Sequence, residues 1–228
     1  MNEKRRALLA LVLLVPVPSF GTWMGMVAAE GPVGQTLFVA SKVWILLLPV
    51  MWIMLMDRQR PRVPRPAARG MPAAVATGSV IFVAIAVGYW WLGRQRIDVE
   101  LMREQIHANG LTTPLLYLLG ALYWCTVNSI LEEYVWRWFV VTRCEVLMPR
   151  LAAVILSGLL FTAHHVIALN DLFFYDWQLT ALGSVGVFIG GTTWSWLYLR
   201  YRNIWAAYVS HVFADVIIFA IGWKLLFM

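Results

Sequence analysis

Charge is scarce in this 228-residue chain, and that scarcity decides its class. Only 13% of the residues are charged, whereas 61% are hydrophobic. A soluble domain carries about 25% charged residues. The composition therefore excludes an ordinary soluble domain and indicates a membrane protein. Thirteen Trp and eight Tyr fit this class, because aromatic residues gather at the two membrane–water interfaces.

Other absences exclude further classes. The two cysteines, Cys125 and Cys144, have no metal-ligand spacing, so we expect free thiols without a redox role. No period of 20–50 residues repeats, which gives an inverted-repeat transporter no support. The HExxH motif of zinc peptidases is missing. The net charge of +6 resides in short loops between apolar runs, so membrane topology explains it better than a nucleic-acid partner.

The apolar runs are long enough to cross a bilayer, which takes about 20 residues each. They predict an all-α fold, a polytopic transmembrane helix bundle of seven spans, or eight if one piece is re-entrant. The runs are 7–28, 36–56, 71–92, 112–143, 151–169, 179–198 and 204–223. We expect a single integral-membrane domain over residues 1–228, with its catalytic helices within 112–223.

Basic residues predict the orientation of the bundle. The N-terminus, the Pro/Arg-rich linker 57–70, the 143–150 connection and "RYRN" at 200–203 carry twelve Lys and Arg, and the opposite loops and C-terminus carry four. This asymmetry predicts a cytoplasmic N-terminus, and the small size and plain layout suggest a bacterial inner membrane. The first apolar run is about 22 residues, longer than a removable signal segment, so we expect it to be retained as a span.

Ionisable residues occur inside the late spans, where each is expensive. A charged group at the centre of a membrane helix costs about 2.5–3.5 kcal/mol on insertion scales, so such residues are functional candidates. The first three spans hold almost none. The late spans hold Glu132, Glu133, Arg137, His164, His165, His211 and Asp215.

In the fourth span, helical spacing separates the roles of the two adjacent glutamates. Glu133 and Arg137 stand at i and i+4 and can form an ion pair. Glu132 is rotated about 100° from Glu133, onto the stripe that contains Asn128 and Ser129. The pair therefore neutralises one carboxylate and leaves the other available. The alternative is a purely structural cluster in which both glutamates surround Arg137.

In the fifth and seventh spans, the spacing again pairs residues on one face. Phe161 lies four residues before His165, and His164 points about 100° away from His165, so one helix cannot easily direct both at one atom. His211 and Asp215 stand at i and i+4, where the carboxylate can accept a hydrogen bond from the ring and fix its tautomer. An interhelical hydrogen bond that only holds the bundle together is the alternative for this pair.

Small residues predict where helices approach closely. Gly158 would let a neighbouring helix approach the fifth span. Gly186 and Gly190 form a GxxxG motif in the sixth span, which we expect to serve packing.

Three motifs in this order resemble the CAAX-protease and bacteriocin-processing family of intramembrane proteases, also called CPBP or Abi. The family pattern is EExxxR, FxxxH and HxxxN or HxxxD on successive helices. Here "EEYVWR" matches at Glu132, Glu133 and Arg137, "FTAHH" at Phe161 and His165, and "HVFAD" at His211 and Asp215. Each motif is short, and the specificity comes from all three together over about residues 112–220.

The resemblance implies hydrolysis of a peptide bond within the bilayer by a water that Glu132 and His165 activate. His211 and Asp215 would complete the catalytic set, with His211 as oxyanion donor, and Glu133, Arg137 and Phe161 would support it. Either no cofactor is used, or zinc is bound by Glu132, His165 and His211. The metal-free reading is slightly favoured.

The resemblance also implies the partners: a membrane protein or peptide as substrate and the lipid bilayer, with no nucleic acid. Bacterial prenylated substrates are not expected, and a cavity lined by Trp136, Trp138 and Phe161 would suit an apolar segment. The oligomeric state and cleavage sequence stay open. A non-catalytic scaffold or immunity-type protein, and a proton-coupled transporter, are the alternatives to an enzyme.

Overall fold

The computed structural model describes residues 2–29, 31–60, 65–108 and 110–228, and these are helical almost throughout, with no strand among them. Residues 61–64 of the expected linker 57–70 lie outside the described residues. In chain order the α-helices are α1 (Glu3–Leu14), α2 (Pro16–Trp23), α3 (Pro32–Leu55), α4 (Met71–Gly88), α5 (Arg94–Arg96), α6 (Val99–Ala108), α7 (Pro114–Tyr123), α8 (Ser129–Glu133), α9 (Val141–Leu147), α10 (Arg150–Leu172), α11 (Trp177–Tyr201) and α12 (Ile204–Phe227). Four π-helical stretches interrupt or end them: η1 (Met24–Ala28), η2 (Tyr89–Gly93), η3 (Trp124–Asn128) and η4 (Tyr134–Val140).

Polar side chains and prolines set the ends of the helices. Asp176 precedes α11, and its Oδ1 accepts hydrogen bonds from the backbone N–H groups of Gln178 and Leu179. Asn203 precedes α12 and accepts in the same way from Trp205. Such caps satisfy N–H groups that have no partner inside the helix. Pro114 stands at the first position of α7, where its missing N–H costs nothing.

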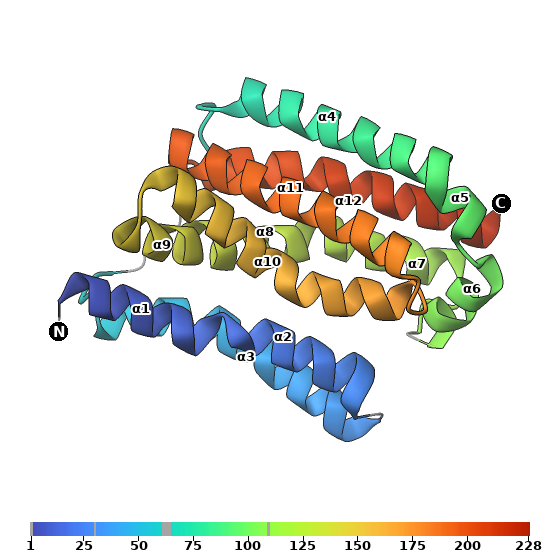
Figure 1. Cartoon of the computed structure of the whole chain (residues 1–228), viewed down its shortest axis with the longest axis horizontal. Coiled ribbons are helices and arrows are strands. Elements are labelled where there is room, and N and C mark those ends of the chain that lie inside the picture. Colours follow the sequence, from blue (N-terminus) through green and yellow to red (C-terminus); the bar gives the residue numbers. More distant parts are fainter. Residues whose placement is uncertain (1, 30, 61–64, 109) are drawn as a thin grey trace.

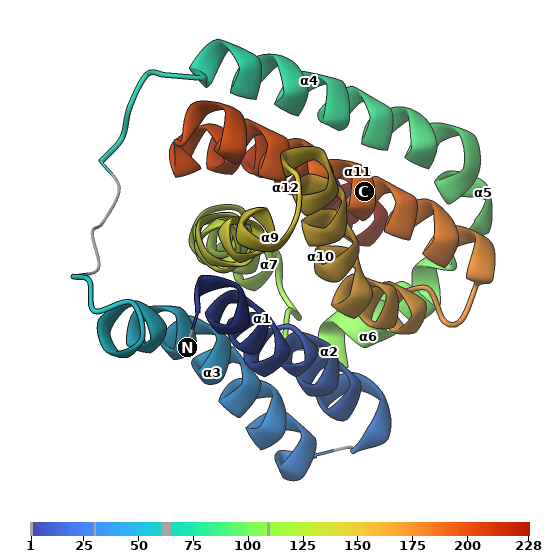
Figure 2. The same cartoon turned by 60° about the vertical axis from the view of Figure 1, so that its left-hand side comes forward.

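The helices form a bundle in which α1–α3 lie on one side and α4 on the other (Figures 1 and 2). The long interrupted helix from α7 to α9 and the helices α10 to α12 lie between them. α10 packs on α11, α11 on α12, and α12 on α4, while α2 contacts α10 and α1 contacts α9. The N-terminus and C-terminus lie at opposite ends of the long axis in Figure 1.

Among the described residues, six helical segments are long and apolar enough to cross a membrane. They are Glu3–Ala28, Pro32–Leu55, Met71–Arg96, Pro114–Leu147, Arg150–Leu172 and Ile204–Phe227. These correspond to six of the seven expected spans. The remaining one, 179–198, lies in α11, a helix of 25 residues whose glycines, serines and threonines make it less apolar than the others.

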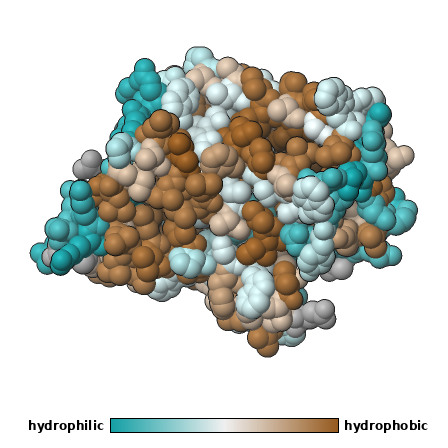
Figure 3. Space-filling view, viewed as in Figure 1, coloured by the Kyte–Doolittle hydropathy of each residue, from teal (hydrophilic) through white to brown (hydrophobic). Residues whose placement is uncertain are grey.

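The surface agrees with a membrane setting. Large apolar side chains are exposed on most of the helices, for example Val80, Trp91 and Leu151. In Figure 3 hydrophobic residues cover much of the middle of the molecule, and hydrophilic ones gather toward both ends of its long axis. A bilayer would cover the apolar middle and leave the hydrophilic ends in water.

A neighbouring helix approaches closely at Gly158, as predicted, but the GxxxG prediction is wrong. A Cβ added at Gly158 would meet Thr192 Cγ2 at 2.4 Å, and one at Gly191 would meet Phe161 Cδ1 at 2.9 Å. A Cβ at Gly186 would meet nothing within 4 Å, and Gly190 is covered by Trp194 of its own helix. The interface therefore uses Gly158 and Gly191, because the motif Gly186–Gly190 lies on another face of α11.

This contact yields a matched pair of substitutions. Gly158→Ala should lower the free energy of unfolding by about 1–3 kcal/mol, the usual cost of overpacking. Gly186→Ala should leave stability unchanged or raise it by up to about 1 kcal/mol, because alanine is the better helix former and its methyl group enters open space. Thermal unfolding of both variants in one detergent measures the difference, and equal midpoints would contradict the assigned interface.

Candidate active site

Three helical segments bring the predicted residues together near the middle of the bundle. The interrupted helix supplies Glu132 and Glu133 from α8 and Arg137 from η4, α10 supplies Phe161 and both adjacent histidines, and α12 supplies His211 and Asp215. The short α8 lies between the π-helical η3 and η4. A π turn bonds residue i to i+5 and so changes the angle at which later side chains project; such turns occur frequently at functional sites.

The back of the site is a fully buried ion cluster. The predicted pair is present: Arg137 Nε lies 3.3 Å from Glu133 Oε2, and both side chains are 0% exposed. The other carboxylate oxygen of Glu133 accepts a hydrogen bond from His211 Nδ1 at 2.9 Å. Glu133 thus bridges an arginine on its own helix and a histidine on α12. Removing charges from water is costly, so each member of this cluster depends on the others.

Aromatic rings enclose the guanidinium of Arg137. Its Cζ lies 4.4 Å from the ring centre of Phe161 and 5.1 Å from that of Trp194. The Nη1 and Nη2 atoms have no hydrogen-bond acceptor among the described residues. Cation–π attraction is strongest where water is excluded, so these two rings take the place of acceptors. This contact gives Phe161, predicted only as a supporting residue, a defined physical task.

The front of the site is partly open. Glu132 is 14% exposed and Asp215 18%. Asn128 donates to Glu132 Oε1 at 3.0 Å, in line with the predicted stripe, and this leaves Oε2 available. His165 Nδ1 lies 2.9 Å from the carbonyl oxygen of Phe161. Because a carbonyl only accepts, Nδ1 carries the proton and Nε2 keeps a lone pair.

His211 lies between three carboxylates, and the predicted partner of its ring is wrong. Glu133, rather than Asp215, accepts the Nδ1 proton and fixes the ring. Asp215 Oδ1 is 3.6 Å and Glu132 Oε2 3.8 Å from Nε2, beyond hydrogen-bond distance. Asp215 is instead held by Ser129, whose hydroxyl donates to it at 2.5 Å. The sequence-based prediction missed Glu133 because the i, i+4 spacing on α12 can indicate only a partner on the same helix.

His164 is closer to the site than its rotation along the helix suggests. The rings of His164 and His165 lie 4.1 Å apart. Glu132, His164 and His165 each offer one ligand atom, and these atoms lie within 4.8 Å of one another. This group could hold a metal ion. It differs from the predicted set of Glu132, His165 and His211, because long side chains reach across the angle between successive helix positions.

Several residues at the site were not assigned from sequence. Trp194 stacks on His211 with ring centres 3.8 Å apart and planes 15° apart. It lies in the sixth span, which has no ionisable residue to attract notice. Asn128 and Ser129 could have been found, because they share the predicted stripe of Glu132.

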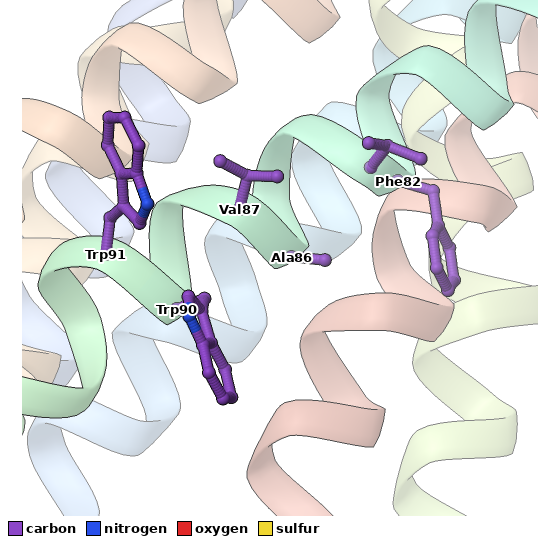
Figure 4. Close-up of a pocket in the computed structure, with 6 residues that line it drawn as sticks. Phe82, Ala86, Val87, Trp90 and Trp91 are labelled. Atoms are coloured by element: carbon purple, nitrogen blue, oxygen red, sulfur yellow. The ribbon is translucent and has the colours of Figure 1, made fainter.

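The predicted cavity of Trp136, Trp138 and Phe161 is absent from the described structure. Trp136 and Phe161 are each 2% exposed and pack edge to face, and Trp138 stacks on Tyr134. An apolar hollow of about 260 Å³ lies instead on α4 and η2. It is lined by Phe82, Val83, Ala86, Val87, Trp90 and Trp91 (Figure 4). These side chains come from one helix flank, so we assign the hollow to the lipid-facing surface.

The buried cluster makes a stability prediction. Arg137→Met should lower the free energy of unfolding by about 3–5 kcal/mol, because it leaves the charge of Glu133 buried and unpaired on that side. The double variant Glu133→Gln, Arg137→Met should recover part of this loss, since no buried charge is stranded. Lys224→Met, at an exposed position on α12, is the control. Equal unfolding midpoints for the single variant and the control would refute the cluster's role.

Comparison with known proteins supports the three motifs. Residues 113–217 match the family model described as type II CAAX prenyl endopeptidase Rce1-like. No curated protein and no solved structure matches. The matched segment runs from the start of α7 into α12 and contains every residue of the ion cluster and of the open front. Over this segment, which is just under half of the chain, the protein is similar to the Rce1-like family of type II CAAX prenyl endopeptidases.

Proposed function

We propose that this integral membrane protein is an endopeptidase that hydrolyses a peptide bond of a membrane-associated protein or peptide, using a water activated by Glu132 and His165. The family match over residues 113–217 supports a CAAX-type protease, and the residue roles are our proposal. The observation that carries it is the division of the site into a closed back, which neutralises Glu133, and an open front, which leaves Glu132 and His165 accessible.

The front residues suit activation of one water molecule. Their ligand atoms lie within 4.8 Å, a separation that a single water bridges with two hydrogen bonds of about 2.7–2.9 Å. Glu132 would accept a proton from the water as it attacks the peptide carbonyl, while His165 accepts the second hydrogen bond through Nε2. The carboxyl group of Glu132 would then return that proton to the departing amine.

His211 is the proposed donor to the oxyanion. Its Nδ1 proton is bound by Glu133, so only the doubly protonated ring can donate from Nε2. Three carboxylates within 4 Å supply the negative charge that such a ring needs. An ionised Asp215 cannot donate, and we propose that it and Ser129 help to balance the charge of the ring.

Zinc at Glu132, His165 and His211 was the alternative to this scheme. The described residues that gather around one point are Glu132, His164 and His165, without His211. Glu133 holds His211 Nδ1, and Trp194 stacks on the face of its ring. We therefore propose hydrolysis without a metal, and no step of the proposed reaction uses one.

The substrate is proposed to reach the site from the lipid. Trp124 and Val127 are exposed apolar side chains within two turns of Glu132. An apolar or amphipathic segment such as a leader peptide or a sorting tail can therefore approach laterally. The distribution of Lys and Arg supports a cytoplasmic N-terminus, and the small size and plain layout support a bacterial inner membrane.

Glu132→Gln should abolish cleavage while the protein stays folded, because the amide cannot accept the proton of the water. The measurement is cleavage of a library of membrane peptides by purified protein in detergent, with and without a zinc chelator. Glu104→Gln, on the exposed face of α6, is the matched control and should cleave like wild type. Cleavage by Glu132→Gln would show that the central assignment is wrong, and activity lost on chelation would show a metalloenzyme.

His211→Leu should lower kcat by about 10²–10³-fold with little change in KM, as expected for loss of one oxyanion donor. Steady-state kinetics on a peptide cleaved by wild type give both constants. A rise in KM with kcat unchanged would instead assign His211 to substrate binding.

A further inference from the structure

His164 has no part in the proposed hydrolysis, yet it lies inside the site. Its side chain is buried, with 9% exposure, and its ring stacks on Trp136 with planes 8° apart. Its Nδ1 has no hydrogen-bond partner among the described residues. A buried polar atom without a partner is costly, and native structures usually satisfy it. The unsatisfied Nδ1 therefore indicates that His164 binds a ligand.

The neighbours of His164 supply a metal-binding set. Glu132, His164 and His165 hold their ligand atoms within 4.8 Å of one another. Two imidazoles and one carboxylate suit zinc and similar divalent transition metals, which take three protein ligands and leave a fourth position open. Bonds of about 2.0–2.2 Å from such an ion place its ligand atoms about 3–4 Å apart, so small side-chain movements would close the set.

Neighbouring groups already orient two of the three ligands. The carbonyl of Phe161 holds the Nδ1 proton of His165 and leaves Nε2 with its lone pair. Asn128 occupies Glu132 Oε1 and leaves Oε2. Metal-binding histidines and carboxylates are typically held in this way by a second layer of hydrogen bonds. The partly exposed Glu132 marks the side from which an ion can enter.

We infer that Glu132, His164 and His165 bind one divalent transition-metal ion, and that the ion switches the site off. The inhibitory part rests on the proposed function, because the ion would occupy the two groups that activate water. His211 is not in the set, because the ligand atoms that lie within 4.8 Å of one another belong to Glu132, His164 and His165.

The charge around the set favours reversible binding. The ammonium of Lys42 lies over the rings of Phe38 and Trp124 and acts electrostatically on Glu132, His164 and His165. A cation beside the set opposes a second one. Lys42→Met should therefore tighten metal binding several-fold, an effect that a purely structural role for Lys42 would not produce.

The test is titration of the purified, metal-free full chain with Co²⁺, whose visible spectrum reports a low-coordinate site. Wild type should bind one ion. His164→Gln and His165→Gln should each weaken binding at least about tenfold, and His211→Gln should weaken it far less. His107→Gln, at an exposed position on α6, is the matched control. Each variant's thermal unfolding shows whether it is folded.

A second variant reports direct ligation. In His164→Cys a cysteine ligand would add a sulfur-to-cobalt charge-transfer band in the near ultraviolet, which wild type lacks. Absence of this band, failure of wild type to bind Co²⁺, or loss of binding in His211→Gln but not in His164→Gln would each overturn the assignment of the ligands.

Proteolysis gives a separate outcome. Adding Zn²⁺ to the active protein should stop cleavage, and a chelator should restore it. Binding at His164 together with activation by zinc would overturn the inhibitory role and the metal-free hydrolysis, but would leave the ligand set standing. Binding without any cleavage by wild type would count against the proposed function alone.

Discussion

The carboxylate of Glu133 is the interaction on which the rest of the site depends. It receives Arg137 on one oxygen and His211 on the other, with no access to solvent. Four helical segments are joined through this one group: the interrupted helix itself, α12 through His211, and α10 and α11 through the contacts of Arg137 with Phe161 and Trp194. In a bilayer interior an unpaired charge is costly, so the cluster forms as a whole or not at all.

The arrangement separates two tasks between adjacent glutamates. Glu133 is held by the protein and has little freedom to react, whereas Glu132 keeps one oxygen toward the open front. The buried cluster provides rigidity, and the polar groups at the front keep the capacity to bind water or an ion. A single exposed carboxylate could act as a base but could not also stabilise the packing of the helices. A single buried carboxylate could not contact a substrate.

The sequence predicted what lies along one helix and missed much of what lies between helices. The pair Glu133–Arg137, the contact of Asn128 with Glu132 and the close approach at Gly158 all follow from helical spacing or residue size. The partner of His211 and the place of His164 do not, since both depend on how α10 and α12 are oriented against α8. That the helix interface uses Gly191 rather than the GxxxG motif also depends on how the helices are oriented against one another. Seven apolar spans were predicted from composition, and six of them are long and apolar enough among the described residues. The seventh, in α11, differs because its glycines, serines and threonines lower its hydropathy.

The π-helical stretches around α8 also constrain how this protein can change over time. Each π turn takes up one more residue than an α turn, so its presence is equivalent to an insertion absorbed inside a helix. Deleting one residue from η3 would therefore restore ordinary α-helical pairing and leave the residues after it close to their present directions. The same deletion in the ordinary α turns of α7 would instead rotate Glu132 and Glu133 by about 100°, away from their partners. The length of this helix between Pro114 and Arg137 is therefore as much a part of the site as the side chains it carries.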